Sequence, residues 1–424
     1  MLSQLRKIPP AYVSTMVAEF GVLLAGIWVY RLASLQFGEQ GFDEYAMCRR
    51  SISFLQPLLI LGFGVGIPRF VAFSMADKKY ASPGSYFYSG LTLSLSFAFL
   101  VLGTLFVFSD TAAFFLFGSS DFAYLITPVL LMILALVFHG LVYGFFRGSM
   151  RTFQANTFQF LNLGLVPILA FYYSEHIVEL LYFTGLAWMS ISLFFLFQIF
   201  ISHPPVFSRD RKPAKELFNY GIRRVPGDFA LAGFMALPAL LTAHLVSDNL
   251  STAGDVAFSV SLVNMAGAAF GPICLLLLPK ASTAFAQNNT GGLLKEVKII
   301  TWFTALSSLV GILIVQIFAE ELLTLYLGSY PSSLPEIVRW VVPGILGFGV
   351  YVSLRSVLDA YYIKAVNTSN IILTSVVFLF ISGATFFMKL DFMYILYGFL
   401  FSVFLLGFLT LRQTFQLLTG KGTT

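Results

Sequence analysis

The sequence predicts an all-α integral membrane protein, with twelve transmembrane helices in two pseudo-symmetric six-helix bundles around a central cavity. Three observations predict this fold class. Apolar residues are in large excess, twelve apolar segments are long enough to cross a bilayer, and several sequence features recur at an offset of 211 residues.

The composition indicates that lipid is the solvent of this fold. Of the 424 residues, 58% are hydrophobic and 11% are charged, and 48 are Phe. An average soluble domain has about 45–50% apolar and about 25% charged residues. A water-soluble fold must cover itself with polar side chains, whereas a membrane protein presents apolar ones to lipid. The two cysteines, Cys48 and Cys274, have no metal or redox spacing, so we expect no disulfide and no metal site.

Twelve segments meet the requirement of about 20 helical residues for each crossing of a bilayer core. They are expected at 11–33, 46–74, 84–108, 122–146, 153–173, 178–201, 217–246, 255–280, 296–319, 334–357, 368–388 and 391–413. Lys and Arg concentrate on the cytoplasmic side of short loops. With both termini in the cytoplasm, all but five of the 25 basic residues fall at cytoplasmic ends, the exceptions being Arg31, Arg49, Arg50, Arg339 and Lys389. We therefore expect a multi-pass protein of the cytoplasmic (inner) membrane.

The longest polar break, SHPPVFSRDRKPAKE, predicts a basic cytoplasmic linker at 202–216. It separates an expected N-terminal six-helix bundle, 1–201, from a C-terminal one, 217–424. Three features recur 211 residues later: Pro68-Arg69 as Pro279-Lys280, Glu44-Tyr45-Ala46 as Asp255-Val256-Ala257, and Asn156 as Asn367. A fourth match is one residue out of this register, LFGS at 116–119 with YLGS at 326–329. Because six spans is an even number, both halves insert in the same orientation, as parallel repeats that enclose a cavity.

Acidic residues inside the predicted spans are candidates for ion coupling, since a charge at the bilayer centre costs about 2.5–3.5 kcal/mol on insertion scales. Glu19 lies about 12 Å along the first span, too deep for a short carboxylate to snorkel. Asp228 is four residues after Arg224, so the two can pair on one helix face, near Pro226 and Gly227, which loosen the helix. Glu19 and Asp228 are the residues expected to bind H⁺ or Na⁺. A self-satisfied Arg224–Asp228 ion pair is the alternative interpretation.

Basic residues at the cytoplasmic ends are candidates for binding an anionic group, such as a lipid pyrophosphate, because arginine presents a planar fork of donors. The expected members of this vestibule are Arg69, Arg223, Arg224, Lys280 and Arg355. Topology alone explains basic residues at these ends equally well. At the outer ends, Arg31, Arg49 and Arg50 are interpreted as snorkelling to headgroups. Neutral polar residues at depth are interpreted as interhelical hydrogen-bonding groups: Gln56, Gln159, Asn162 and Asn264.

The sequence contains no phosphate-binding P-loop, nucleophile elbow or zinc motif. We therefore expect no enzymatic activity, no catalytic residue and no cofactor beyond a coupling ion. Uphill transport would use an ion gradient or an external partner.

Five segments occur in order along the chain: EYA before the second span, IPRFVAFSMADKK closing it, YGIRRVP opening the seventh, LPKASTAFAQ closing the eighth, and LRSVLDAYYIKAVNTSNI between the tenth and eleventh. With these segments the chain resembles the polysaccharide flippases, which are O-antigen and teichoic-acid export proteins of the multidrug, oligosaccharidyl-lipid and polysaccharide exporter superfamily. The resemblance implies two bundles, alternately open to either side, that carry a polyprenyl-pyrophosphate-linked oligosaccharide to the outer leaflet. Relatives often carry an Asp-Arg pair in the middle of the seventh span, where this chain has MALPALLTA, so coupling details are not carried across.

The expected partners are the lipid-linked oligosaccharide, membrane lipids, a polysaccharide polymerase and glycosyltransferases, with no nucleic acid and with a monomeric protein. Two alternatives stay open. A cation-coupled drug or metabolite antiporter of the same superfamily would favour a cavity dominated by carboxylates. A non-transporting membrane scaffold of an envelope-assembly complex would have no use for Glu19.

Overall fold

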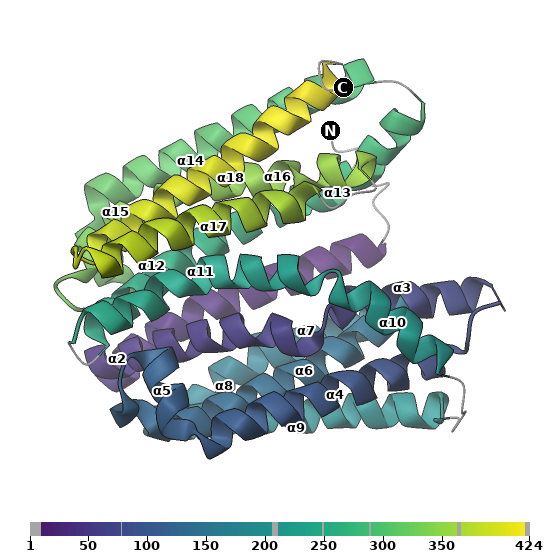
Figure 1. Cartoon of the computed structure of the whole chain (residues 1–424), viewed down its shortest axis with the longest axis horizontal. Helices are drawn as coiled ribbons and strands as arrows, with labels where there is room; N and C mark the ends of the chain where they lie inside the picture. The colour runs from purple at the N-terminus through teal and green to yellow at the C-terminus, as the bar shows by residue number, and fades with distance from the viewer. Residues whose placement is uncertain are drawn as a thin grey trace. The chain divides into compact units, whose positions relative to one another are not determined.

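The computed structural model describes residues 10–77, 79–205, 211–247, 250–287, 290–362 and 366–419, and all regular secondary structure in these ranges is helical (Figure 1). The predicted all-α fold is confirmed. The chain divides into two compact units, residues 1–229 (unit 1) and 230–424 (unit 2). Residues 206–210 of the predicted linker lie outside the described residues, and the bundle boundaries expected at 201 and 217 stay a prediction.

The first helix of unit 1, α2 (Pro10–Ile60), contains two crossing segments joined at Gly38, where φ is 68°. The Arg49 guanidinium lies 5.6 Å from the ring centroid of Tyr30. In a straight helix, 19 residues would separate them by about 28 Å. The chain therefore turns back at Gly38. After a second break at Leu61 and Gly62, both with positive φ, helix α3 (Phe63–Ala76) completes the second span.

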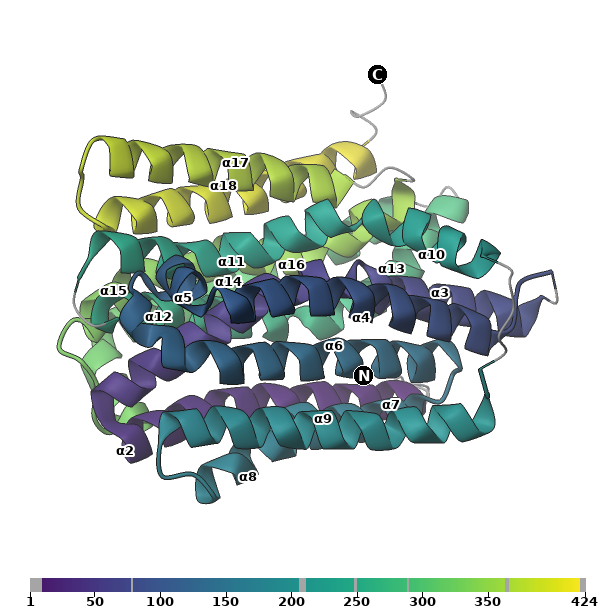
Figure 2. The same cartoon turned by 60° about the horizontal axis from the view of Figure 1, so that its bottom comes forward.

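The other elements of unit 1 pack around α6, which is buried over most of its surface. They are α4 (Pro83–Val107), α5 (Ser109–Phe117), the 3₁₀ turn η1 (Ser120–Leu125), α6 (Ile126–Gly148), α7 (Thr152–Gln159), the π segment η2 (Phe160–Leu165), α8 (Val166–Tyr172), α9 (Ile177–Ser202) and α10 (Lys212–Ile222). Figure 2 shows α4, α6 and α9 side by side.

Helix α10 packs against α3 and α4, and so belongs to unit 1. Its contact with the second span is made by two glycines. A Cβ on Gly62 would lie 2.7 Å from the carbonyl oxygen of Gly221, and a Cβ on Gly221 would collide with the carbonyl oxygen of Leu61. Only glycine allows the two backbones to approach this closely.

Helix α11 (Val225–Leu245) begins in unit 1 and continues into unit 2. The remaining elements of unit 2 are α12 (Ser251–Ala269), α13 (Gly271–Ala286), α14 (Thr290–Leu327), α15 (Leu334–Val341), α16 (Gly344–Tyr361), α17 (Val366–Phe387) and α18 (Met393–Leu418). Helix α14 is kinked at Phe318.

By length and hydropathy, nine helices of the described residues can cross a membrane, or ten when α15 and α16, bent by 43°, count as one span. The stretch Val13–Ala76 holds two of the predicted spans, one on each side of Gly38. The span predicted at 153–173 is divided by the π segment into α7, η2 and α8. With these two additions, each of the twelve predicted spans corresponds to a helix or a broken helix.

The predicted internal repeat recurs in the backbone. Helix α4 is interrupted at Phe108 (φ −106°) and α14 at Phe318 (φ −114°), and the following short helical stretches stop at Gly118 (φ 80°) and Gly328 (φ 84°). Both pairs are 210 residues apart, the register in which LFGS and YLGS match.

A buried acid also recurs at equivalent places in the two units. Glu44 accepts a hydrogen bond from the Tyr124 hydroxyl (2.9 Å), and Asp255, 211 residues later, accepts one from Ser333 (2.6 Å). Each bond joins the start of the second span of a unit to the start of its fourth. We refer to these two bonds as the acid clamps.

Candidate functional site

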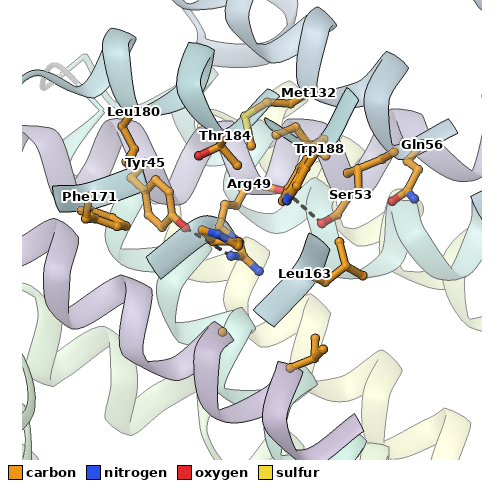
Figure 3. A pocket seen from close by; sticks show the side chains of 15 residues that line it. Tyr45, Arg49, Ser53, Gln56, Met132, Leu163, Phe171, Leu180, Thr184 and Trp188 are labelled. Carbon is orange, nitrogen blue, oxygen red and sulfur yellow. Dashed lines mark hydrogen bonds between the residues drawn. The ribbon is translucent and has the colours of Figure 1, made fainter. Parts of the chain in front are cut away.

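Unit 1 contains a cavity of about 210 Å³ between α2, α6, η2 with α8, and α9 (Figure 3). Most of its wall is apolar, with Met132, Leu136, Leu163 and Pro167 among the lining residues. Its polar and aromatic lining residues are Tyr45, Arg49, Ser53, Gln56, Phe171, Thr184 and Trp188.

Arg49 is the one charged residue among the lining residues. Its Nη1 donates to the Tyr45 hydroxyl (3.3 Å), and its guanidinium lies 5.6 Å and 5.9 Å from the ring centroids of Tyr30 and Tyr45. The Tyr45 ring is packed edge-on against Tyr30 and Phe171. These contacts hold a positive charge at the wall of a cavity inside the helical core, where screening by water is weak.

Trp188 is fixed by the π segment. Its indole nitrogen donates to the backbone carbonyl of Asn162, which lies within η2. A π turn disturbs the regular helical hydrogen bonding, and such turns are frequent at functional sites. The Asn162 amide also donates to Ser192 Oγ (3.0 Å) and lies 3.2 Å from His139 Nδ1. The interhelical role predicted for Asn162 is confirmed.

A second cluster, which we call the arginine–tyrosine cluster, lies where α3 packs against α10 and the turn that follows α10. The Arg69 guanidinium is 5.0 Å from the ring centroid of Tyr220, and that of Arg224 is 6.0 Å from the same ring. Arg223 is adjacent, in the turn between α10 and α11. All three arginines are exposed. The structure therefore brings together two of the five predicted substrate-binding residues, Arg69 and Arg224, and Arg223 precedes Arg224 in the chain.

The other two predicted substrate-binding residues lie in unit 2. Lys280 forms an exposed ion pair with Glu296 (3.1 Å). Arg355 is partly buried on α16, with its guanidinium 5.8 Å from the ring centroid of Tyr351, and its backbone carbonyl accepts a bond from Asn367 (2.8 Å).

Glu19, the first predicted ion-coupling residue, is exposed on α2. Its spacing places it on the same helix face as Val22 and Gly26, which line the cavity. It also lies within electrostatic range of Tyr143, whose hydroxyl accepts a bond from Arg147 (3.4 Å).

Asp228, the second predicted ion-coupling residue, is half-buried in the first turn of α11. Ion pairs in the described part of the chain join Lys280 to Glu296 and Arg339 to Glu320, and neither includes Asp228. The Arg224–Asp228 ion pair, which was the alternative interpretation of these residues, does not form in the structure. The helix break expected near Pro226 does occur, as a turn at Arg223 and Arg224.

The sequence interpretation missed Arg49. We expected Arg49 and Arg50 to snorkel outwards, but Arg49 lines the cavity and Arg50 is only 4% exposed. Gln56 was expected to act between helices, and it lines the cavity instead. Among the described residues, no group of three or more His, Cys, Asp or Glu side chains could hold a metal ion.

The chain is similar to known proteins in its three-dimensional structure, but no match was found at the level of sequence. No protein-family model and no curated protein sequence matches the chain. An inward-facing multidrug resistance MATE family transporter of the MOP superfamily superposes with a TM-score of 0.72 at 14% identity, covering 97% of this chain and 96% of that chain. An outward-facing structure of a MATE family transporter gives 0.61 at 14% identity, covering 98% and 97%.

A MOP superfamily transporter from Pyrococcus furiosus, described as having a binding pocket of reversed polarity, gives a TM-score of 0.67 at 14% identity and covers 97% of this chain and 95% of that chain. The chain has the MATE transporter fold. Within this MATE fold, both the cavity and the arginine–tyrosine cluster are built from residues of unit 1. Both present cationic and aromatic side chains.

Proposed function

We propose that the chain is a flippase that translocates a polyprenyl-pyrophosphate-linked oligosaccharide across the cytoplasmic membrane for cell-surface polysaccharide biosynthesis. The MATE transporter fold supports the coarser part, a multi-pass membrane transporter. The observation that carries the finer part is the arginine–tyrosine cluster, in which Arg69 and Arg224 lie over the ring of Tyr220.

The cluster has the chemistry of a pyrophosphate site. Stacking against an aromatic face orients a guanidinium, while its edge keeps a fork of donors free for phosphate oxygens. The two guanidinium groups can act on two phosphoryl groups, and Arg223, the residue before Arg224, would supply a third. The cluster lies at the end of the second span, expected at the cytoplasmic interface, where a lipid headgroup would sit while its polyprenyl chain stays in lipid.

The remaining residues receive roles in the same proposal. Lys280 and Arg355 would supply further basic contacts, and Glu19 or Asp228 would bind H⁺ or Na⁺ and bias alternating access. Both termini would be cytoplasmic, no cofactor would be required, and a monomer would act with a polysaccharide polymerase and glycosyltransferases.

The test compares undecaprenyl pyrophosphate with undecaprenol, which lacks the phosphates, in binding to the detergent-purified protein. Hydrogen bonds to charged groups contribute about 1.5–3 kcal/mol, roughly tenfold to a hundredfold in affinity. We expect the pyrophosphate to bind at least about tenfold more tightly, and R69Q/R224Q to remove that preference.

The matched control is R412Q, an exposed arginine of α18 in unit 2. It should bind the pyrophosphate as the wild type does. Equal affinity of the wild type for the two lipids would reject the pyrophosphate site, as would an R69Q/R224Q variant that still prefers the pyrophosphate.

A second candidate function is a cation-coupled drug or metabolite antiporter, favoured by the similarity to a multidrug resistance MATE family transporter. No acidic side chain is among the residues that line the cavity, which disfavours a lipophilic cation as its ligand. Ethidium efflux from proteoliposomes under an H⁺ or Na⁺ gradient distinguishes the two. Gradient-driven efflux that is lost in D228N or E19Q would establish the antiporter in place of the flippase.

A further inference from the structure

Two polar side chains of the unit 1 cavity carry hydrogen-bonding groups that the protein does not use. Thr184 is 4% exposed and Gln56 is partly buried, and both line the cavity. Within the described ranges, neither the Thr184 hydroxyl nor the Gln56 amide forms a hydrogen bond with another residue. Buried polar groups are almost always hydrogen-bonded, and an unpaired one is costly inside a membrane. The two groups are therefore suited to a ligand that carries hydroxyls.

The internal repeat indicates that the fold does not require these polar groups. The residue 211 positions after Thr184 is Ile395, which is fully buried, and the residue 211 positions after Gln56 is Gly267. Unit 2 therefore builds the same places with an apolar side chain and with no side chain. The amide and the hydroxyl of unit 1 are better explained by binding than by folding.

The cavity has room for one ring. Pockets that bury drug-sized ligands measure about 300–1,000 Å³, and this cavity measures about 210 Å³. Neither a whole oligosaccharide nor a large amphipathic drug fits a space of this size. A single sugar ring with its substituents does.

The aromatic lining residues fit the faces of a sugar ring. A pyranose is apolar on its faces, which carry C–H groups, and polar at its rim, which carries hydroxyls. Tyr45, Phe171 and Trp188 supply flat apolar surface in the cavity wall (Figure 3). Trp188 is held by its bond to the Asn162 carbonyl, so this surface is in place before a ligand binds.

The charges of the lining favour a neutral ligand. No lining residue is acidic, so a cation would find no carboxylate in the cavity. Arg49, the charged lining residue, is engaged by the protein: its Nη1 donates to the Tyr45 hydroxyl, and its guanidinium lies near the rings of Tyr30 and Tyr45. A neutral ring fits against this wall without drawing Arg49 away from these contacts.

From the unused polar groups, the size and the aromatic wall together, we propose that the unit 1 cavity is a subsite for one neutral pyranose of the saccharide that the proposed flippase carries. The faces of the ring lie against the aromatic side chains, and its hydroxyls bond to Gln56 and Thr184. This proposal rests on the proposed function and assigns one sugar of its substrate to unit 1.

The experiment uses the full chain in lipid nanodiscs, which avoid detergents with sugar headgroups, and Trp188 is the reporter. The other tryptophans, Trp28, Trp302 and Trp340, are 47%, 76% and 42% exposed, so replacing them with Phe disturbs little packing. The single-tryptophan protein is titrated with the methyl glycosides of glucose, galactose and N-acetylglucosamine, with methyl glucuronide, and with sorbitol, while Trp188 fluorescence is recorded.

We expect saturable quenching by at least one neutral glycoside. Its Kd should be at least about tenfold lower than that of sorbitol, an open-chain polyol that has no ring faces and loses more conformational freedom on binding. Methyl glucuronide, which adds a negative charge to the glucose ring, should bind no more tightly than methyl glucoside.

Substitutions in the cavity test the two polar groups. Q56L removes the amide, and T184V keeps the volume and removes the hydroxyl. Each should raise the Kd of the bound glycoside about threefold to tenfold, and T184V serves as the second variant if Q56L does not fold. S190A removes an exposed hydroxyl from the same helix as Thr184 and should leave the Kd unchanged.

The neutral-sugar subsite is overturned if no neutral glycoside gives a saturable response, if sorbitol binds as tightly, if methyl glucuronide binds more tightly than methyl glucoside, or if Q56L and T184V both bind as the wild type does. Undecaprenyl pyrophosphate binding is measured on the same single-tryptophan protein. Retention of pyrophosphate binding without glycoside binding rejects the subsite and leaves the flippase proposal standing. Glycoside binding without pyrophosphate binding supports the subsite and rejects the lipid-linked substrate.

Discussion

Helices α6 and α9 of unit 1 and their counterparts about 211 residues later, α16 and α18 of unit 2, are packed in different ways. In unit 2, a Cβ on Gly407 would lie 2.5 Å from the carbonyl oxygen of Gly347, and a Cβ on Gly347 would lie 2.6 Å from that of Val403. The two backbones therefore touch. The residues of unit 1 at these positions are Leu136 and Leu196, and Leu136 lines the cavity. In unit 2 the glycines let the two helices close up, whereas in unit 1 the larger leucine side chains at these positions hold the helices apart.

The same contrast holds for the polar lining. The residue 211 positions after Arg49 is Val260, which is fully buried, and that after Trp188 is Phe399, packed against Phe234 with ring centroids 5.5 Å apart. Gln56 corresponds to Gly267, whose position is crowded by the ring of Phe348. Since unit 2 folds with these positions apolar and filled, the repeat does not require a polar cavity. The cavity of unit 1 is a property of its own residues, as expected of a functional site.

The largest effect should come from replacing a glycine of unit 2 with the leucine that occupies the equivalent position of unit 1. In G347L the new Cβ meets a backbone carbonyl, which cannot move aside as a side chain can. We expect α16 and α18 to be forced apart at a cost of about 3 kcal/mol in the free energy of unfolding, measured by thermal unfolding in detergent. G311L on α14, where an added Cβ meets no atom within 4 Å, is the control. Equal stability of the two variants would contradict the packing difference.

A smaller effect is expected when Asn162 of unit 1 is replaced by leucine, the residue found at the equivalent position 373 of unit 2. In N162L, the buried His139 ring and Ser192 hydroxyl lose their amide partner. The expected loss is about 2 kcal/mol, from the range of 1–3 kcal/mol for leaving a buried polar group unpaired. Thermal unfolding measures it, with N264L at an exposed position of α12 as the matched control. If N162L unfolds at the same temperature as the wild type, the hydrogen bonds of Asn162 do not stabilise unit 1.

The acid clamps are a feature that the two units share, so breaking either should have a similar effect. Y124F and S333A each remove a hydroxyl that donates to a buried acid, and each should lower the free energy of unfolding by about 1.5 kcal/mol. Y330F, which removes an exposed hydroxyl bonded to a backbone carbonyl, should change it by less than about 0.5 kcal/mol. Losses that differ widely between the units would show that the clamps are not equivalent.

The smallest effect is expected at the exposed ion pair of unit 2. The side chains of Lys280 and Glu296 are 61% and 47% exposed, and exposed ion pairs contribute about 0–1 kcal/mol. K280Q should therefore change the free energy of unfolding by less than about 0.5 kcal/mol, measured by the same unfolding experiment. Any loss of pyrophosphate binding in K280Q could then be assigned to charge, whereas a large drop in stability would make Lys280 a structural residue.

The fold could be predicted from the sequence because its determinants are local. Span length and the sign of loop charge place the twelve segments, and motifs such as Glu44-Tyr45-Ala46 and Asp255-Val256-Ala257 mark the repeat. The π segment at 160–165 could not be predicted, since the stretch FLNLGLVPILAF is apolar on nearly all faces and has no periodic pattern that an extra residue could interrupt.

The site could be predicted only in part because its residues meet through tertiary packing. Arg69 and Arg224 were identified from their charge and position, but their meeting at Tyr220 depends on how α10 packs on α3. Arg49 was misread because its place near the end of a span resembles that of a snorkelling residue. The sequence did contain a signal, because the repeat places Val260 in the other half at the position of Arg49. The preference for basic residues at cytoplasmic ends acts on both halves alike, so it does not explain an arginine found in one half alone.

The contact between Gly62 and Gly221 has a mechanical consequence. Helix α10 continues through one turn into α11, which runs on into unit 2. Because backbone atoms meet backbone atoms at this contact, no side-chain rotamer can change to make room if the two segments are pressed together. A displacement of α10 towards the second span would therefore be felt directly at the break formed by Leu61 and Gly62.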